Sequence, residues 1–271
     1  MSNRGERRYG VKVLERISQA GLTYYRKAGW KGVRHGIFTR HGGVSQSHWS
    51  SLNLGASIGD DLAAVKENHR RMYDAAAVNP ARAVSSWLVH SVKTLVINGQ
   101  RPAEGGLEKA DAIITDQADT PLVMRYADCV PLLFYDPAKR AIGLGHAGWR
   151  GTVKGMAGIM VRQMRSAFGC SPEDIQVVIG PAISRRNYRV GAEVVAAANA
   201  YFGADAGVVA RDPADGGSRF DLWGANCLDL ARHGVLNVEV LEICTFENTD
   251  EFYSHRAENS LTGRFGVVIS L

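Results

Sequence analysis

Residues 122–152 read LVMRYADCVPLLFYDPAKRAIGLGHAGWRGT. Apolar runs at 122–124, 131–135 and 141–144 alternate with short turn-forming stretches, a pattern typical of consecutive β-strands. Another apolar run at 112–115 precedes them. These runs predict a sheet in the middle of the chain, with Cys129 and a histidine close to the strand ends.

Helices and further strands are predicted before and after this segment along the chain. Asp60 or Asp61 can cap a helix whose apolar residues recur at helical spacing. Thr152 can cap a second helix that ends at Gly169. This second helix covers 153–168. The remaining predicted elements are helices at 194–201 and 221–233, strands at 33–39, 175–179, 238–243 and 265–269, and a glycine- and aspartate-rich loop at 203–217.

The runs 83–89 and 92–97 are also rich in β-forming residues, and only His90 and Ser91 separate them. They predict either a tight hairpin or one bent strand, with His90 at the break. The chain has 271 residues, 45% of them hydrophobic, which is enough for a large core. Without an internal repeat or a long linker, it is predicted to form one α+β domain over 1–271, with a peripheral segment at 1–30.

Charge and cysteine usage narrow the class of protein. The net charge is +5, but the basic residues are scattered, so nucleic-acid binding is not expected. No apolar run reaches the roughly 18 residues of a membrane span, and a cytoplasmic protein is expected. The four cysteines form no CxxC pair, which predicts free thiols.

His90, Cys129 and His146 together satisfy the usual requirement of a catalytic zinc site, which is three protein ligands and one open position. Their separations of 39 and 17 residues match no short metal motif. Spacing alone favours, for any one of them, a structural role: His90 as a turn histidine, Cys129 as a buried thiol or His146 as a hydrogen-bonded core residue. Cys129 could also be a nucleophile activated by His146, and such a pair would not need His90.

Other residues near these three carry charge. Asp128 could act in proton transfer or support the neighbouring ligand, or it could merely form a turn. Arg150 lies before a predicted helix start, where backbone N–H groups and a guanidinium suit an anion such as phosphate. Arg40, beside a Gly-Gly pair, and Arg256 are further candidate anion contacts. The sequence contains neither a Walker loop nor a dinucleotide-binding GxGxxG.

Several motifs occur in the same order as in a known family. They are Thr-Arg-His-Gly-Gly-Val-Ser at 39–45, Ser-Leu-Asn-Leu-Gly at 51–55, Ala-Asp-Cys-Val-Pro at 127–131, Gly-His-Ala-Gly-Trp-Arg-Gly-Thr at 145–152, Ile-Gly-Pro-Ala-Ile at 179–183, Cys-Thr at 244–245, and Ser-His-Arg and Thr-Gly-Arg near the end. With these motifs the chain resembles the bacterial YfiH-type laccase-domain family over about residues 33–271.

The resemblance implies an α/β/β/α layered fold with mixed sheets and zinc ligands at His90, Cys129 and His146. It also implies phosphorolysis of adenosine, inosine, guanosine and methylthioadenosine, together with deamination of adenosine. An older description of the family implies a copper-dependent polyphenol oxidase. The remaining alternatives are a metal-free Cys-His hydrolase and a nucleotide-binding module without turnover.

The chain departs from the family pattern in three places. His90 precedes Ser91 rather than a glycine. The stretch 180–190 lacks the family's cysteines and its glutamate, and Ala257 replaces the second residue of an Arg-Arg pair. The three expected ligands are retained, so these departures bear on the choice of substrate.

Overall fold

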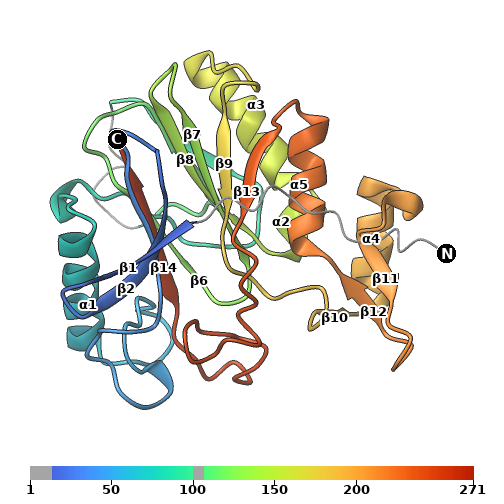
Figure 1. Ribbon diagram of the computed structural model, residues 1–271, viewed down its shortest axis with the longest axis horizontal. Helices are drawn as coiled ribbons and strands as arrows, with labels where there is room; N and C mark the ends of the chain where they lie inside the picture. The colour runs from blue at the N-terminus through green and yellow to red at the C-terminus, as the bar shows by residue number, and fades with distance from the viewer. Residues whose placement is uncertain (1–13, 100–106) are drawn as a thin grey trace.

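The computed structural model describes residues 14–99 and 107–271, and its centre consists of two sheets (Figure 1). The five-stranded sheet is antiparallel throughout. Its strands, in spatial order, are β1 (Leu14–Gln19), β2 (Leu22–Lys27), β3 (Arg34–Phe38), β14 (Phe265–Ser270) and β6 (Leu122–Tyr126).

The six-stranded sheet is mixed, because its two outer pairs are parallel and its inner pairs are antiparallel. Its strands, in spatial order, are β13 (Asn237–Val240), β9 (Gln176–Ile179), β7 (Val130–Asp136), β8 (Ala141–Ala147), β5 (Ala112–Thr115) and β4 (Thr94–Ile97). Strands β5, β7, β8 and β9 agree with the predicted runs, and β13 is shorter than predicted.

Alternating side chains give each sheet one face toward the other sheet and one face toward helices. Leu133 of β7 and Leu144 of β8 are buried in one core with Met124 of β6 and Val267 of β14. The helix α1 (Leu62–Ala75) covers the outer face of the five-stranded sheet, while α3 (Met156–Phe168) and α5 (Leu222–Arg232) cover that of the six-stranded sheet (Figure 1). The predicted α/β/β/α layering is therefore confirmed.

A smaller unit of secondary structure lies beside α5 (Figure 1). It contains a three-stranded antiparallel sheet of β10 (Arg189–Val190), β12 (Ser218–Phe220) and β11 (Val209–Arg211), and the helix α4 (Ala192–Phe202). The prediction of a loop throughout 203–217 is partly wrong, because β11 and the 3-10 turn Ala204–Ala206 form there. Strand β11 pairs with the next strand, β12, across the short loop 212–217.

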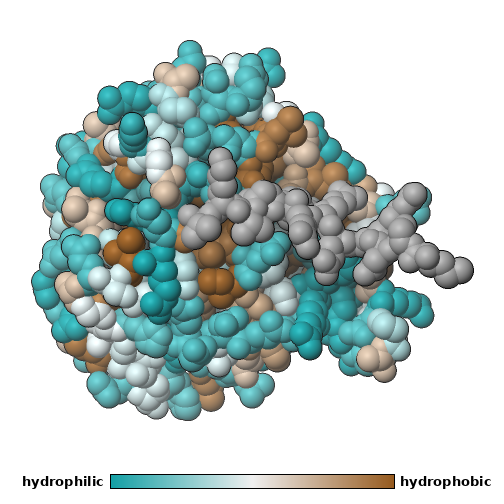
Figure 2. Space-filling model, in the orientation of Figure 1, coloured by the Kyte–Doolittle hydropathy of each residue, from teal (hydrophilic) through white to brown (hydrophobic). Residues whose placement is uncertain are grey.

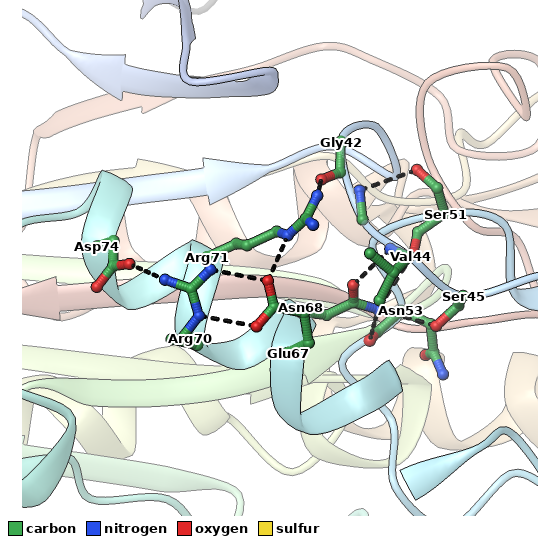
Figure 3. Close-up of polar contacts among 11 residues, drawn as sticks. Gly42, Val44, Ser45, Ser51, Asn53, Glu67, Asn68, Arg70, Arg71 and Asp74 are labelled. Atoms are coloured by element: carbon green, nitrogen blue, oxygen red, sulfur yellow. Dashed lines mark hydrogen bonds and ion pairs between the residues drawn. The ribbon is translucent and has the colours of Figure 1, made fainter. Parts of the chain in front are cut away.

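Buried polar side chains fix the loop that follows β3. Asp61 caps α1 by accepting from the backbone N–H groups of residues 63 and 64, as predicted. Two turns further along, the fully buried Asn68 accepts from Val44 N and donates to Ser45 Oγ, Ser51 O and Asn53 O (Figure 3). A single amide thus holds both arms of the loop against α1.

The helix predicted over 153–168 is present but begins three residues later, as α3 at Met156 with Gly155 as its N-cap. A short helix α2 (Trp149–Thr152) comes first, with Gly148 as its N-cap, so Thr152 lies inside a helix and does not cap one. Gly155 then breaks the path with φ +75°, and a Cβ there would lie 2.0 Å from the Tyr201 hydroxyl. Contact with a distant helix therefore makes glycine necessary at this position.

The prediction of a strand at 83–89 is also wrong. This segment forms only isolated bridges, from Val84 to Leu122 and from Trp87 to Lys109. Strand β4 begins later, at Thr94. His90 accordingly lies neither in a hairpin turn nor in a bent strand, but in a connecting segment.

The described part of the predicted peripheral segment forms β1 and β2 at a sheet edge, and residues 1–13 lie outside the described part. Within residues 14–99 and 107–271, none of the helices has the length and apolar character needed to cross a membrane. Hydrophilic residues cover most of the face drawn in Figure 2. The extent of a single domain over 1–271 stays a prediction.

Candidate metal centre

One end of the six-stranded sheet brings the candidate ligands together. Val130 pairs with Ala147 and Pro131 with His146, so Cys129, just before β7, lies diagonally across from His146 near the end of β8. Residues two apart on a strand share a face, and diagonal cross-strand neighbours are within reach of long side chains. Both side chains therefore project toward the five-stranded sheet.

His90 reaches the same place from the segment before β4. Strand β4 is parallel to β5, and both begin at the end of the sheet where β8 finishes. The His90 backbone is left-handed, with φ +57°, which is uncommon for a non-glycine residue and marks functional sites. Its ring lies 5.2 Å from that of His146, edge to face.

The three ligand atoms of His90, Cys129 and His146 lie within 4.8 Å of one another. Among the described residues, they form the one group of three or more potential ligands. His90 is exposed, Cys129 half-buried and His146 buried, so the group opens to solvent on one side. Two imidazoles and a thiolate with one open side fit the donor set of a catalytic zinc site.

Cys129 and His146 each stabilise the charged form of the other. Burial alone would raise the pKa of Cys129, but the charge of His146, with hydrogen bonds from His146 and His90, outweighs it and lowers that pKa to about 6. Burial alone would lower the pKa of His146, but Cys129 and Asp111 raise it to about 9. Cys129 is therefore poised as a thiolate, the form that binds metal.

Alkylation of Cys129 provides a test of this lowered pKa. In metal-free protein, the rate of iodoacetamide modification of Cys129 is expected to rise through a midpoint near pH 6, because the thiolate is the reacting form and is present above the pKa. Peptide mass spectrometry at a series of pH values measures it. A midpoint near the value of about 8.5 for an ordinary thiol would contradict the assigned electrostatics.

Asp111 is a central residue of the site that the sequence analysis did not select. Its side chain is fully buried and accepts five hydrogen bonds, from the backbone N–H groups of Val89, His90 and Ser91, from Ser91 Oγ, and from His146 Nδ1. Burial would raise the pKa of Asp111, but the hydrogen bonds from His146 and Ser91 outweigh it and lower it to about 2. Its place directly before a strand that starts at the ligand-bearing end of the sheet was the available signal.

Asp128 directly precedes the ligand Cys129, but its carboxylate is hydrogen-bonded to residues of other loops. Its Oδ1 accepts from Thr245 Oγ1 at 2.6 Å and Ser254 Oγ at 2.7 Å, and its Oδ2 accepts from Arg256 N at 2.7 Å. Its backbone is left-handed, with φ +81°. Asp128 thereby joins β7 to two distant loops, and its part in proton transfer stays a prediction.

Arg150 and Arg256 lie around Tyr188, close to the ligands. Burial raises the pKa of the Tyr188 phenol, and the charge of Cys129 raises it further, whereas Arg256 and Arg150 oppose the increase. The Arg256 guanidinium lies 5.2 Å from the centre of the Tyr188 ring, and that of Arg150 lies 4.4 Å from the Trp149 ring. Both arginines are exposed, and the Arg256 guanidinium also donates to Arg189 O at 3.1 Å.

Arg40 is placed differently. Its guanidinium donates to Ser50 O and Thr249 O and pairs with Glu258 at 3.1 Å. It also lies 4.3 Å from the centre of the Tyr253 ring. These partners tie the loop after β3 to the C-terminal loops, and they already engage the groups with which Arg40 would bind an anion.

Gly148 and Arg264 are further residues near the ligands to which the sequence analysis assigned no role. A Cβ at position 148 would lie 2.9 Å from Cys129 Sγ and 3.2 Å from His90 Cδ2. Burial lowers the pKa of Arg264, and the negative charges of Cys129 and Asp128 partly compensate. Both residues belong to sequence motifs noted above, but their roles depend on contacts across the fold.

The layered fold and its His-Cys-His group define a mixed α/β protein with a candidate metal centre. The chain belongs to the family described as multi-copper polyphenol oxidoreductase laccase, whose model matches residues 34–271.

Proteins similar to this chain carry a different name from the family description, purine nucleoside phosphorylase. The purine nucleoside phosphorylase YlmD of Geobacillus stearothermophilus is 36% identical over 241 residues, which cover 86% of this chain and 88% of that protein. The purine nucleoside phosphorylase YfiH of Escherichia coli is 35% identical over 246 residues, 89% of this chain and 95% of that one. The crystal structure of the Geobacillus YlmD matches with a TM-score of 0.88 at 32% identity, covering 95% of this chain and 98% of the other.

Proposed function

We propose that this chain is a zinc-dependent purine nucleoside phosphorylase. Adenosine, inosine, guanosine and methylthioadenosine are its proposed substrates, and adenosine deamination is a second proposed activity. The observation that carries the proposal is the convergence of His90, Cys129 and His146 within 4.8 Å, in a chain whose relatives are named purine nucleoside phosphorylases.

In the proposed phosphorolysis, a phosphate oxygen forms a bond to C1′ of the sugar while the bond from C1′ to N9 of the purine breaks. The electron pair leaves with the purine, which takes up a proton, and the second product is the sugar 1-phosphate. In the deamination, water replaces the amino group at C6 and ammonia leaves. Zinc held by the three ligands supplies a Lewis acid for this chemistry.

The side chains of this chain have separate proposed tasks. Arg150 and Arg256 neutralise the incoming phosphate, because both are exposed and their charges, like that of Cys129, act on the pKa of Tyr188. Arg40 was the third expected phosphate contact, and its existing partners favour a supporting position at the edge of the site. Asp128 is the proposed proton carrier, and to act it must exchange one of its three present donors.

Phosphate dependence distinguishes this function from hydrolysis. With inosine as substrate, zinc-loaded protein is expected to release hypoxanthine only when phosphate is present, and to form one ribose 1-phosphate for each base released. Chromatographic quantification of both products at a series of phosphate concentrations measures this. Base release at the same rate without phosphate would instead support a hydrolase that uses the Cys129 and His146 pair.

A copper-dependent polyphenol oxidase is the second candidate, because the family description names copper and copper also accepts a His2Cys donor set. A multi-copper enzyme needs additional histidine-rich sites. In residues 14–99 and 107–271 no second group of three ligands gathers. Phenol oxidation that requires protein-bound copper, in protein without phosphorolytic activity, would favour this candidate.

A further inference from the structure

Two of the three candidate ligands depend on one buried carboxylate, that of Asp111. It immediately precedes β5, and the register of β5 with β8 places it opposite His146. A backbone hydrogen bond of 2.7 Å from His146 N to Asp111 O fixes this pairing. The side chain has no exposed surface, so water cannot replace its hydrogen-bond partners.

The first contact decides which nitrogen of His146 faces the other ligands. Asp111 Oδ1 lies 3.1 Å from His146 Nδ1. Because an ionised carboxylate can only accept hydrogen bonds, Nδ1 must keep its proton, so Nε2 is the nitrogen that loses its proton when a metal binds. Histidine ligands of zinc are commonly oriented by a carboxylate in this way.

The second set of contacts holds the His90 turn. Three consecutive backbone N–H groups, at residues 89, 90 and 91, point at the Asp111 carboxylate, with distances of 3.3, 2.9 and 2.7 Å. Ser91 Oγ donates as well, at 2.8 Å. A left-handed φ is energetically unfavourable at a non-glycine residue, so His90 needs such support to remain in place.

We infer that Asp111 is the positioning residue of the metal centre: before any ion binds, it fixes the backbone turn of His90 and orients the His146 ring so that Nδ1 keeps its proton and Nε2 faces the metal. The inference rests on the proposed metal-binding function. It goes beyond that function by assigning the geometry of two ligands, separated widely in sequence, to a residue that is not itself a ligand.

Asp111→Asn tests the inference at nearly constant side-chain size. The amide offers one acceptor oxygen and one NH2 group, so in either orientation a donor faces His146 Nδ1 or the turn N–H groups. Zinc affinity, measured by competition with a chromophoric chelator, is expected to fall by roughly 10–100-fold. Wild-type affinity in Asp111→Asn would overturn the inference.

Asp136→Asn is the matched control. Asp136 is also fully buried and accepts two backbone N–H groups, from residues 138 and 139. It ends β7, whereas Cys129 precedes the start of that strand, which places it roughly 20 Å from the ligands. This variant is expected to keep wild-type zinc affinity, and an equal loss in both variants would show a general effect of removing a buried carboxylate.

A measurement on the wild-type protein does not depend on the folding of a variant. In zinc-loaded protein labelled with 15N-histidine, correlations between ring protons and nitrogens are expected to show His146 with a proton on Nδ1. A proton on Nε2 would overturn the inference even if Asp111→Asn does not fold. Wild-type protein that takes up no zinc would instead reject the proposed metal centre and thereby separate the two failures.

Discussion

Cys129→Ala is expected to abolish zinc binding and purine nucleoside turnover together. The variant removes the one thiolate of the group and leaves two imidazoles. The loss of zinc affinity should therefore exceed the roughly 10–100-fold typical of changes to residues that only support ligands.

Metal analysis and phosphorolysis assays on one preparation test this expectation. Cys170→Ala is the matched control, because Cys170 is a buried free thiol that belongs to the core under α3 and not to the ligand group. That variant should retain zinc and activity. Unchanged phosphorolysis in Cys129→Ala would show that the chemistry occurs without this group.

Gly148→Ala is expected to produce a comparable loss by adding a single methyl group. The backbone at Gly148, with φ −73° and ψ 177°, is accessible to alanine, so the change does not strain the chain. Its Cβ would, however, lie 2.9 Å from Cys129 Sγ and 3.2 Å from His90 Cδ2. Because β7 begins directly after Cys129 and fixes its backbone, Sγ has little freedom to move. The added methyl group must therefore push Cys129 Sγ and the His90 ring apart.

Zinc affinity is expected to fall by at least about tenfold in Gly148→Ala, with the fold retained. Gly151→Ala provides the control three residues away, because its Cβ would meet only ordinary contacts at 3.5 Å or more. The two variants should differ in zinc affinity and resemble each other in circular dichroism. Equal zinc affinity in both would contradict the assigned position of Sγ.

The sequence predicted the layers of the fold where local patterns determine the structure. The runs that became β5 to β9 are apolar and bounded by turn residues, and Asp61 caps α1 as expected. The errors arose where distant contacts decide. Tyr201 leaves no room for a Cβ at Gly155, the left-handed N-cap that delays the start of α3 to Met156, and the run at 83–89 lacks a continuous partner strand.

In the site, too, local sequence patterns predicted some residues, whereas others depend on distant contacts. Cys129 and His146 could be selected because each is a potential ligand close to a strand end. Asp111 also precedes a strand directly, but its role could not be predicted, because it depends on backbone N–H groups about 20 residues earlier and on a ring in another strand. The engagement of Arg40 by Glu258 likewise depends on a contact between distant loops.

Reconstitution of zinc-free protein tests the central claim most directly. Phosphate-dependent release of hypoxanthine from inosine, measured while zinc is added in steps, is expected to rise in proportion to bound zinc and to reach its maximum at about one ion per chain, as the single His90, Cys129 and His146 group requires. Full phosphorolytic activity in protein from which zinc has been removed would contradict the account.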